Sequence, residues 1–222
     1  MSTLLLHLAS PLQAWGSDSK FEVRQTSREP TKSGVIGMLS SALGRKRNEP
    51  VDDLSHLKFG IRADREGTVI EDFHTVVYKS KKPPYVTKRY YLSDAVFTVG
   101  LESEDTAFLE KLEYALKNPV YPLFLGRRSC PPTLPVVLGI REKSLEDALT
   151  SEPFFDKKHE ENYVRIVLDD ATNRHIETRI KDVPISFNPE LRQFGYRTTT
   201  EKFIDICDDH NTEHDAFKEM ED

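Results

Sequence analysis

The sequence predicts an α+β fold in which two β-α-β units form one antiparallel sheet with helices on one face. Three observations carry this prediction. Residues 3–9 form an apolar run typical of a buried strand, residues 33–43 and 105–117 show helical periodicity, and a predicted strand follows each helix. The β-α-β order, repeated around an inserted hairpin, is the ferredoxin-like arrangement.

The first unit runs from the N-terminal strand to the start of the inserted hairpin. Apolar side chains in 33–43 recur at spacings of three and four residues, which places them on one helical face. Gly44 can end this helix. Apolar alternation then predicts a strand over 57–63, and a further strand is expected over 68–78.

The second unit begins after a polar segment. Residues 79–88 are polar and interrupted by Pro83-Pro84, so they separate the hairpin strands. An aromatic-rich run predicts one strand over 90–101, and 105–117 forms a helix that Asn118-Pro119 stops. A last strand is expected over 134–140.

The predicted organisation has three parts. Residues 1–140 form the core, with a thumb-like insertion at about 78–90, and 141–200 form a smaller C-terminal β-rich lobe. Residues 201–222 form an acidic tail that is an exposed helix or disordered. Within the lobe we expect a helix near 144–150 and strands near 163–169 and 174–181.

The charge of the chain is unevenly distributed. The formal net charge is −6, but residues 201–222 hold nine acids and two lysines, so residues 1–200 carry +1. Local basic patches can bind a polyanion even when the total charge is negative. Two such zones stand out: Lys79, Lys81, Lys82, Lys88 and Arg89; and Lys20, Arg24, Arg28, Lys32, Arg45, Lys46 and Arg47.

Several classes of protein are disfavoured. No apolar run approaches the roughly 20 residues of a membrane span, and the N-terminus lacks a basic leader. Cys130 and Cys207 form no CxxC pair, so reduced thiols in a cytoplasmic protein are expected. His210 and His214 are spaced like metal ligands, but in so acidic a tail a solvated segment is favoured. We expect no metal or other cofactor.

The loop Gly126-Arg127-Arg128-Ser129 is the first candidate binding site. The glycine allows close approach of the backbone, and Pro131-Pro132 restrains the exit from the loop. Arginine matches phosphate geometry and stacks on bases. The functional interpretation is a phosphate or nucleic-acid contact; the alternative is a solvated turn.

The start of the first helix is the second candidate. Thr31 or Ser33 can cap it, and a helix N-terminus can hold a phosphate through its free backbone N–H groups. Lys32, Ser33 and Gly34 would supply charge, a donor and room. The GxxxxGK[ST] pattern is absent, so this is no P-loop. The alternative is an ordinary capped helix.

The basic segment from Tyr78 to Tyr91 is the third candidate. Lysines alternate there with tyrosines, a composition that suits single-stranded RNA because backbone charge and base stacking act together. The alternative is a solvated hairpin tip whose lysines discourage aggregation.

Several segments occur together in an informative order: LHLASPLQAWG (6–16), PTKSGVIGMLSSALG (30–44), DFHT (72–75), RYYLSDAVFTV (89–99) and NPVYPLFLGRRSCPP (118–132). Through these segments the chain resembles the CasD family, the subunit of the type I-E CRISPR surveillance complex (Cascade) that holds the 5′ handle of the CRISPR RNA. The segment DVP…F…RQFGYR, over 182–197, resembles the family more weakly.

The resemblance implies a ferredoxin-like core of the RAMP type, related to RNA-recognition folds, with a protruding hairpin thumb. It implies a noncatalytic subunit that binds CRISPR RNA, contacts the backbone and large subunits of the complex, and meets target DNA only indirectly. The residues expected to contact RNA are Gln13, Trp15, Arg24, Lys32, Ser33, Gly34, Tyr85, Lys88, Arg89, Gly126, Arg127, Arg128 and Ser129. Trp15 could stack on a base, or it could belong to the core.

Two alternative functions stay open, and one of them is a pure protein-scaffold subunit whose basic loops are incidental. A sister branch, type I-C, uses this subunit to cut repeat RNA without metal, through a tyrosine, lysine and histidine set. Such chemistry needs a general base and a cation. His74, with Tyr78, Lys79 or Lys88, could supply them; the favoured role of His74 is structural or RNA-contacting.

Overall fold

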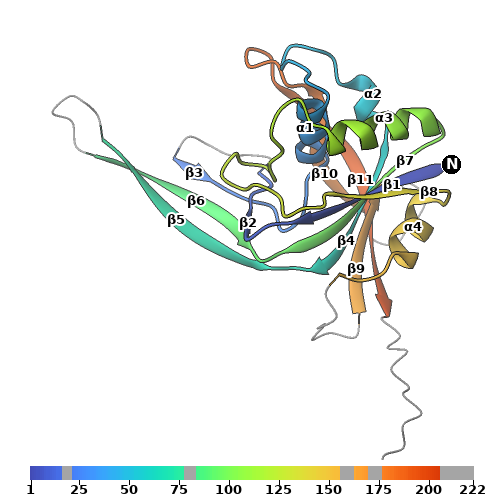
Figure 1. Cartoon of the computed structure of the whole chain (residues 1–222). Helices are drawn as coiled ribbons and strands as arrows, with labels where there is room; N and C mark the ends of the chain where they lie inside the picture. The colour runs from blue at the N-terminus through green and yellow to red at the C-terminus, as the bar shows by residue number, and fades with distance from the viewer. Residues whose placement is uncertain (17–21, 78–83, 156–162, 170–176, 206–222) are drawn as a thin grey trace, which may run out of the picture.

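The chain forms two β-sheets with helices on both faces of the larger one (Figure 1). The computed structural model describes residues 1–16, 22–77, 84–155, 163–169 and 177–205. The elements in these ranges are β1 (Ser2–Ala9), β2 (Leu12–Gln13), β3 (Val23–Arg24), α1 (Lys32–Ala42), α2 (Asp52–Ser55), β4 (Lys58–Arg65), β5 (Thr68–Val76), β6 (Tyr85–Ser93), β7 (Val96–Ser103), α3 (Thr106–Lys117), β8 (Val137–Arg141), α4 (Leu145–Ser151), β9 (Tyr163–Asp169), β10 (Glu177–Ser186) and β11 (Gln193–Asp205).

The larger sheet has seven strands in the order β10-β11-β9-β4-β7-β1-β8, and every neighbouring pair is antiparallel. β1 lies between β7 and β8, so both of its edges are paired, and a core packs against each of its faces. Leu4, Leu6 and Leu8 point into the main core, whereas Leu5 belongs to a smaller core on the opposite face. This follows from the alternation of side chains along a strand.

The helices divide between the two faces of this sheet. α1 and α3 cover the main core, and α4 packs on the opposite face. The predicted helices 33–43 and 105–117 correspond to α1 and α3, and the predicted helix 144–150 to α4. Asp105 caps α3 by accepting the backbone N–H of Phe108 at 2.9 Å. Of the helices in the described ranges, none is long and apolar enough to cross a membrane.

A long hairpin projects from the body of the molecule (Figure 1). Its arms are β5 and β6, paired from Thr68 opposite Ser93 to Val76 opposite Tyr85. β2 and β3 pair with the other edge of β6. Part of the predicted thumb at 78–90, namely residues 78–83, lies outside the described residues. β5 starts at the first residue of the strand expected over 68–78, whereas β6 begins at Tyr85, inside the segment 79–88 that was expected to separate the hairpin strands.

One predicted strand is in fact two. The sequence indicated a single strand over 90–101, but β6 ends at Ser93 and β7 begins at Val96. Asp94 between them has φ +57°, a left-handed conformation that breaks the ladder. The break lets β6 belong to the projecting hairpin while β7 enters the main sheet.

The C-terminal part joins the main sheet rather than forming a sheet of its own. β9 pairs with β4, and β11 pairs with β9 and β10, so the strands of the region expected to form a smaller lobe continue the main sheet. β11 was not predicted, and it continues to Asp205, past the expected start of the tail at 201. Its buried positions include Arg197 and Thr199, so the strand lacks the apolar alternation that predicts strands.

Candidate nucleic-acid interface

The N-terminal end of α1 is closed by a carboxylate from β10. Asp182 Oδ2 accepts the backbone N–H of Lys32 at 2.8 Å, and Thr31 Oγ1 caps the helix by accepting from Gly34 N at 3.2 Å. The ammonium group of Lys32 forms an ion pair with Asp169 at 3.0 Å. A helix N-terminus attracts an anion, and here Asp182 supplies it from within the chain.

Arg197 of β11 completes this buried ionic group. Its Nε and Nη2 donate to Asp182 at 2.6 and 2.9 Å, its Nη1 donates to Asp169 at 2.6 Å, and its guanidinium lies over the ring of Phe59. Burial alone would lower the pKa of Arg197, but hydrogen bonds to and the charges of Asp182 and Asp169 outweigh it and raise the pKa. Arg197 therefore stays charged, and each of its three side-chain nitrogens donates to Asp182 or Asp169.

The groups of the phosphate site that we predicted at the start of α1 are engaged within the chain. Lys32 is only 6% exposed, and Ser33 is buried as well. Gly34 lies against Trp15, whose ring carbon Cε3 a Cβ on Gly34 would meet at 2.8 Å. These three residues fix the helix to the sheet, and within the described ranges the ammonium group of Lys32 is already paired with Asp169.

Gln13 and Trp15 are also internal. Trp15 is 1% exposed, and its indole Nε1 donates to Gln13 Oε1 at 2.9 Å. The amide nitrogen of Gln13 in turn donates to the backbone oxygens of Leu8 and Ala95. The structure therefore supports the core alternative for Trp15 and engages the polar atoms of both side chains within the chain.

The loop 125–130 is held in one conformation by its own backbone. Leu125 N donates to Cys130 O at 2.8 Å, and Cys130 N donates to Arg127 O at 2.9 Å. Gly126 has φ +83°, and a Cβ there would lie 1.6 Å from Ala14 O, so only glycine fits. Burial raises the pKa of the Cys130 thiol, which makes it a neutral core residue.

Arg127 ties this loop to two other segments. Its Nη1 donates to Tyr90 O at 3.0 Å, and its Nη2 donates to Arg24 O at 2.9 Å. The guanidinium also lies 4.6 Å from the ring centroid of Tyr91. Arg127 thus positions β3 and β6 beside the loop, a structural role that the sequence did not indicate.

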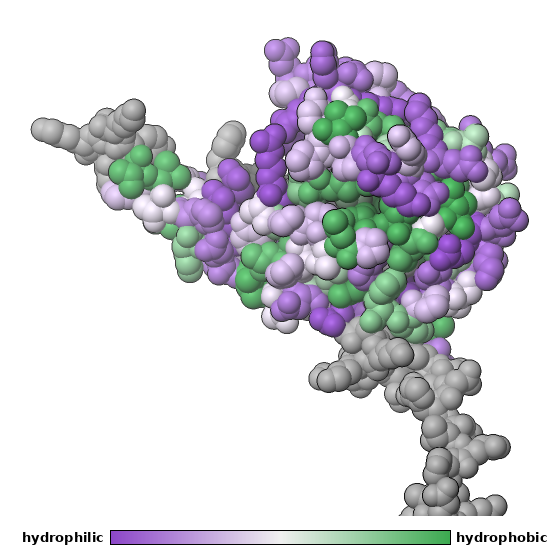
Figure 2. Space-filling model, in the orientation of Figure 1, coloured by the Kyte–Doolittle hydropathy of each residue, from purple (hydrophilic) through white to green (hydrophobic). Residues whose placement is uncertain are grey.

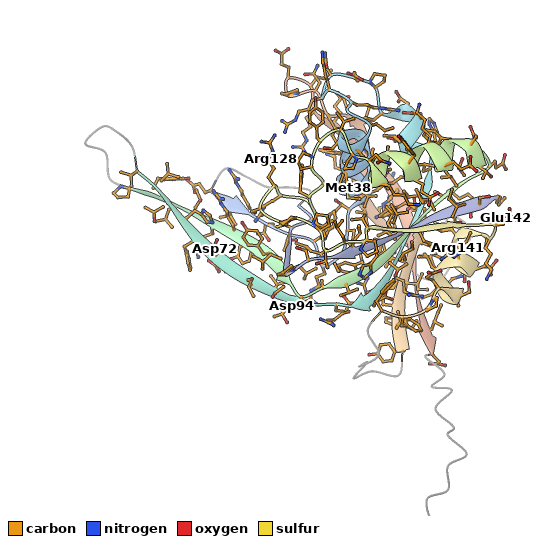
Figure 3. The ribbon with its side chains drawn as sticks, viewed as in Figure 1. Met38, Asp72, Asp94, Arg128, Arg141 and Glu142 are labelled. Atoms are coloured by element: carbon orange, nitrogen blue, oxygen red, sulfur yellow. The ribbon has the colours of Figure 1, made fainter. Side chains whose placement is uncertain are left out.

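Four arginines meet where the hairpin joins the body. Arg24 and Arg89 are register partners in the parallel β3–β6 pair, and Arg127 and Arg128 come from the loop; we call these four the arginine cluster. Arg128 is exposed on the side of the body that faces the hairpin (Figure 3). Figure 2 shows strongly hydrophilic side chains where the hairpin meets the body.

The charges of the cluster are poorly compensated. Among the described residues, Arg24, Arg89 and Arg128 form no ion pair with a carboxylate, and Arg89 Nε is a buried donor without a partner. Ser129 is exposed beside Arg128. Guanidinium groups with unused donors at close range suit a phosphodiester backbone. The structure thus brings together five of the predicted contact residues, from segments about 60 and 40 positions apart.

The hairpin presents the remaining candidates on different faces. Lys88 pairs with Glu71 at 2.9 Å and lies over the ring of Phe73. His74, the next residue after Phe73, points to the other face and its Nε2 contacts Asp72 Oδ2 at 2.6 Å. The suggested catalytic partners His74 and Lys88 are therefore separated by the thickness of the hairpin, while Tyr78 and Lys79 lie outside the described residues.

Apolar side chains gather toward the far end of the hairpin. Tyr85 is half-buried there, opposite Val76, and Val77 and Val86 are exposed (Figure 2). An exposed apolar group of this kind on a projecting ribbon marks a contact surface rather than a folding core.

The sequence analysis missed the residues that close the α1 N-terminus, Asp169, Asp182 and Arg197. One indication was present: the DVP and RQFGYR segments contain Asp182 and Arg197, and they fell in the weaker part of the resemblance. The interaction joins residues 150 positions apart, so no local pattern could reveal it.

Comparison with known proteins fits this geometry. The family model described as CRISPR-associated protein (Cas_Cas5) matches residues 3–200. The chain is 35% identical to the CRISPR system Cascade subunit CasD of Escherichia coli (strain K12), over 88% of this chain and 93% of the relative.

Two solved structures are also similar. A chain of a CRISPR RNA-guided surveillance complex superposes with a TM-score of 0.80 at 32% identity, covering 92% of this chain and 90% of that one. A structure titled as a Cas protein gives a TM-score of 0.75 at 40% identity, covering 91% and 95%. The protein described here therefore belongs to the Cas5 family of CRISPR-associated proteins.

Proposed function

We propose that this chain is a noncatalytic, RNA-binding subunit of a type I-E Cascade complex that grips the 5′ handle of the CRISPR RNA. The arginine cluster carries the proposal. Three segments distant in sequence converge there, and none of the four guanidinium groups pairs with a carboxylate within the described ranges. Such a cluster binds phosphates and positions an RNA strand without requiring a particular base.

Within the cluster the two loop arginines, Arg127 and Arg128, have different roles. Arg127 uses its donors on backbone oxygens of β3 and β6, so it fixes the geometry of the site. Arg128 is exposed with no described partner and supplies the handle contact. Arg24 and Arg89 extend the positive surface along the hairpin base, which sets the path of the RNA strand.

The body acts as a ferredoxin-like core and the hairpin as a thumb. The strand order β4-β7-β1-β8, with α1 and α3 in the two crossovers, supports the first assignment. The projecting β5–β6 arms and the exposed apolar side chains Val77 and Val86 support the second (Figure 1). The thumb would lie where the handle meets the guide and contact the backbone subunit, while the body contacts the large subunit.

A second function, metal-independent cleavage of repeat RNA, rests on one observation. The His74–Asp72 contact at 2.6 Å resembles a base held by a carboxylate. Cleavage would also need a cation beside His74. Lys88 of β6 lies on the opposite face of the hairpin and pairs with Glu71, so it does not supply that cation to His74 and Asp72. The noncatalytic function is therefore the one that we propose.

The experiment that separates the two functions is incubation of the full chain with labelled repeat RNA in EDTA. Retention of intact RNA supports handle binding. Site-specific cleavage that His74→Ala abolishes and Arg128→Ala leaves intact would assign the chain to the endoribonuclease branch. An RNA that is neither retained nor cut would leave the chain as a protein scaffold and contradict both.

A further inference from the structure

A second basic and aromatic surface lies on β10 and β11, away from the arginine cluster. Its centre is Tyr196, whose side chain is 58% exposed. The guanidinium carbon of Arg179 lies 5.2 Å from the ring centroid of Tyr196, and Nζ of Lys181 lies 5.7 Å from it. Arg179 and Lys181 are both exposed. We call these three residues the β10–β11 surface.

The surface occupies the face of the sheet opposite the buried ionic group. Successive strand residues point to opposite faces, and Arg197 points toward Asp182 and Phe59 on the α1 side. Tyr196 therefore points to the α4 side. Lys202 lies six residues farther along β11, so it shares a face with Tyr196. Lys202 pairs with Glu146 of α4, which confirms that this face is the α4 side.

The β10–β11 surface and the arginine cluster lie on separate elements. β10 and β11 belong to the seven-stranded sheet, whereas β3 and β6, which carry Arg24 and Arg89, belong to the four-stranded sheet. We therefore expect the two surfaces to contact different nucleotides.

The cations of this surface are available to a ligand. No described carboxylate pairs with Arg179 or Lys181, whereas Lys202 is paired with Glu146 and Arg197 is saturated by two aspartates. A cation beside an exposed aromatic ring provides both phosphate neutralisation and a plane on which a base can stack. An apolar protein partner would not require unpaired cations here.

We propose that Arg179, Lys181 and Tyr196 form a second nucleic-acid contact, which binds a single-stranded segment outside the handle. Arg179 and Lys181 neutralise two neighbouring phosphates, and Tyr196 stacks on a base. The expected ligand is single-stranded nucleic acid. An exposed aromatic ring on a β-sheet can stack on an unpaired base, but it cannot stack on the paired bases inside a duplex. The strand can be RNA or displaced DNA, and these sources share the same recognition chemistry.

The test uses the full chain and labelled 12-nucleotide RNA and DNA strands that lack the handle sequence. Affinity is measured by fluorescence anisotropy over a salt series. The triple variant Arg179→Ala/Lys181→Ala/Tyr196→Ala should bind at least about fivefold more weakly. Its plot of log affinity against log salt should be flatter by about 1.4, or 0.7 for each of two phosphates.

A matched control exists on α3. Lys111→Ala/Tyr114→Ala/Lys117→Ala also removes two cations and one exposed tyrosine, and Tyr114 is 70% exposed. This control should bind within twofold of the parent chain. Tyr196→Phe should keep most of the affinity, because the ring still stacks. Loss with RNA alone, DNA alone or both identifies which strand the surface takes.

Two results would overturn the proposal. One is equal binding of the β10–β11 variant and the α3 control. The other is a result in which Arg128→Ala loses binding to strands without the handle sequence, while the β10–β11 variant keeps it. That result would assign all single-strand binding to the arginine cluster. The handle proposal is tested separately, because the β10–β11 variant should still bind repeat RNA through Arg24, Arg89 and Arg128.

Discussion

Asp182 accepts the backbone N–H of Lys32, a residue 150 positions earlier, and so serves as the anion at the N-terminus of α1. The same carboxylate accepts two hydrogen bonds from Arg197, which joins β10, β11 and α1 into one unit. The helix start that the sequence suggests as a phosphate site is therefore closed by a carboxylate of the chain itself, and we propose that nucleic acid binds instead at surfaces that keep unpaired cations.

Asp182→Ala should lower the free energy of unfolding by about 3–5 kcal/mol, because it leaves the buried charge of Arg197 without its main partner. Urea titration followed by circular dichroism measures the change. Glu113→Ala removes the exposed i,i+4 ion pair with Lys117 and serves as the control, with an expected loss of about 0.3–0.5 kcal/mol. Equal losses in the two variants would contradict the structural role of Asp182.

Arg128→Ala should weaken binding of handle RNA without changing the unfolding midpoint, because the side chain is exposed and has no described partner. The salt dependence should lose about 0.7 in slope, the value for one phosphate contact on a single strand. Arg127→Ala should instead lower both affinity and stability, because it removes donors to Tyr90 O and Arg24 O. Identical behaviour of the two variants would refute the division of roles.

Gly126→Ala should destabilise the chain by at least about 2 kcal/mol, since it combines a left-handed backbone with a 1.6 Å approach to Ala14 O. Gly37→Ala in α1 is the matched control. A Cβ there meets Phe187 at an ordinary 3.8 Å, so the change should be neutral or stabilising by about 0.5–1 kcal/mol. Thermal unfolding of the two variants compares them directly, and a harmless Gly126→Ala would show that the loop is not fixed.

His7 should make stability depend on pH. Burial lowers the pKa of His7 below its ordinary 6.5, and the charge of Asp64 only partly opposes this. The unfolded chain then binds a proton first as the pH falls, so stability is greatest above about pH 6.5 and declines toward the lower folded-state pKa. His7→Phe keeps the ring contact with Phe155 but cannot titrate. Its stability should fall less between pH 6.5 and 5 in urea titrations, and equal slopes would exclude His7 as the cause.

The predicted and observed structures differ for identifiable physical reasons. The helices α1 and α3 follow from local periodicity, and the strands β1 and β4 follow from buried or alternating apolar residues. β11 escaped prediction because its inward side chains include Arg197, which is buried only through partners elsewhere in the chain. The strand break at Asp94 depends on one left-handed residue inside an otherwise regular β pattern.

The candidate site was predictable only in part. Basic segments around Arg24, Arg89 and Arg127 were visible in the sequence, and the structure brings them together. The separate roles of Arg127 and Arg128 could not be predicted, because they depend on the fold. Arg127 donates to backbone oxygens of β3 and β6, whereas Arg128 has no described partner. Trp15 was read as a possible stacking residue; its burial follows from Gln13 and Gly34, whose contacts depend on the fold.

The most direct test of the central claim is a nuclease footprint of the full chain on labelled CRISPR RNA in EDTA, with Arg24→Ala/Arg128→Ala as the paired variant. Handle binding predicts protection of nucleotides 5′ of the guide, intact RNA, and loss of that protection in the variant. Uniform accessibility of the handle, or cleavage of the RNA by the parent chain, would contradict the account.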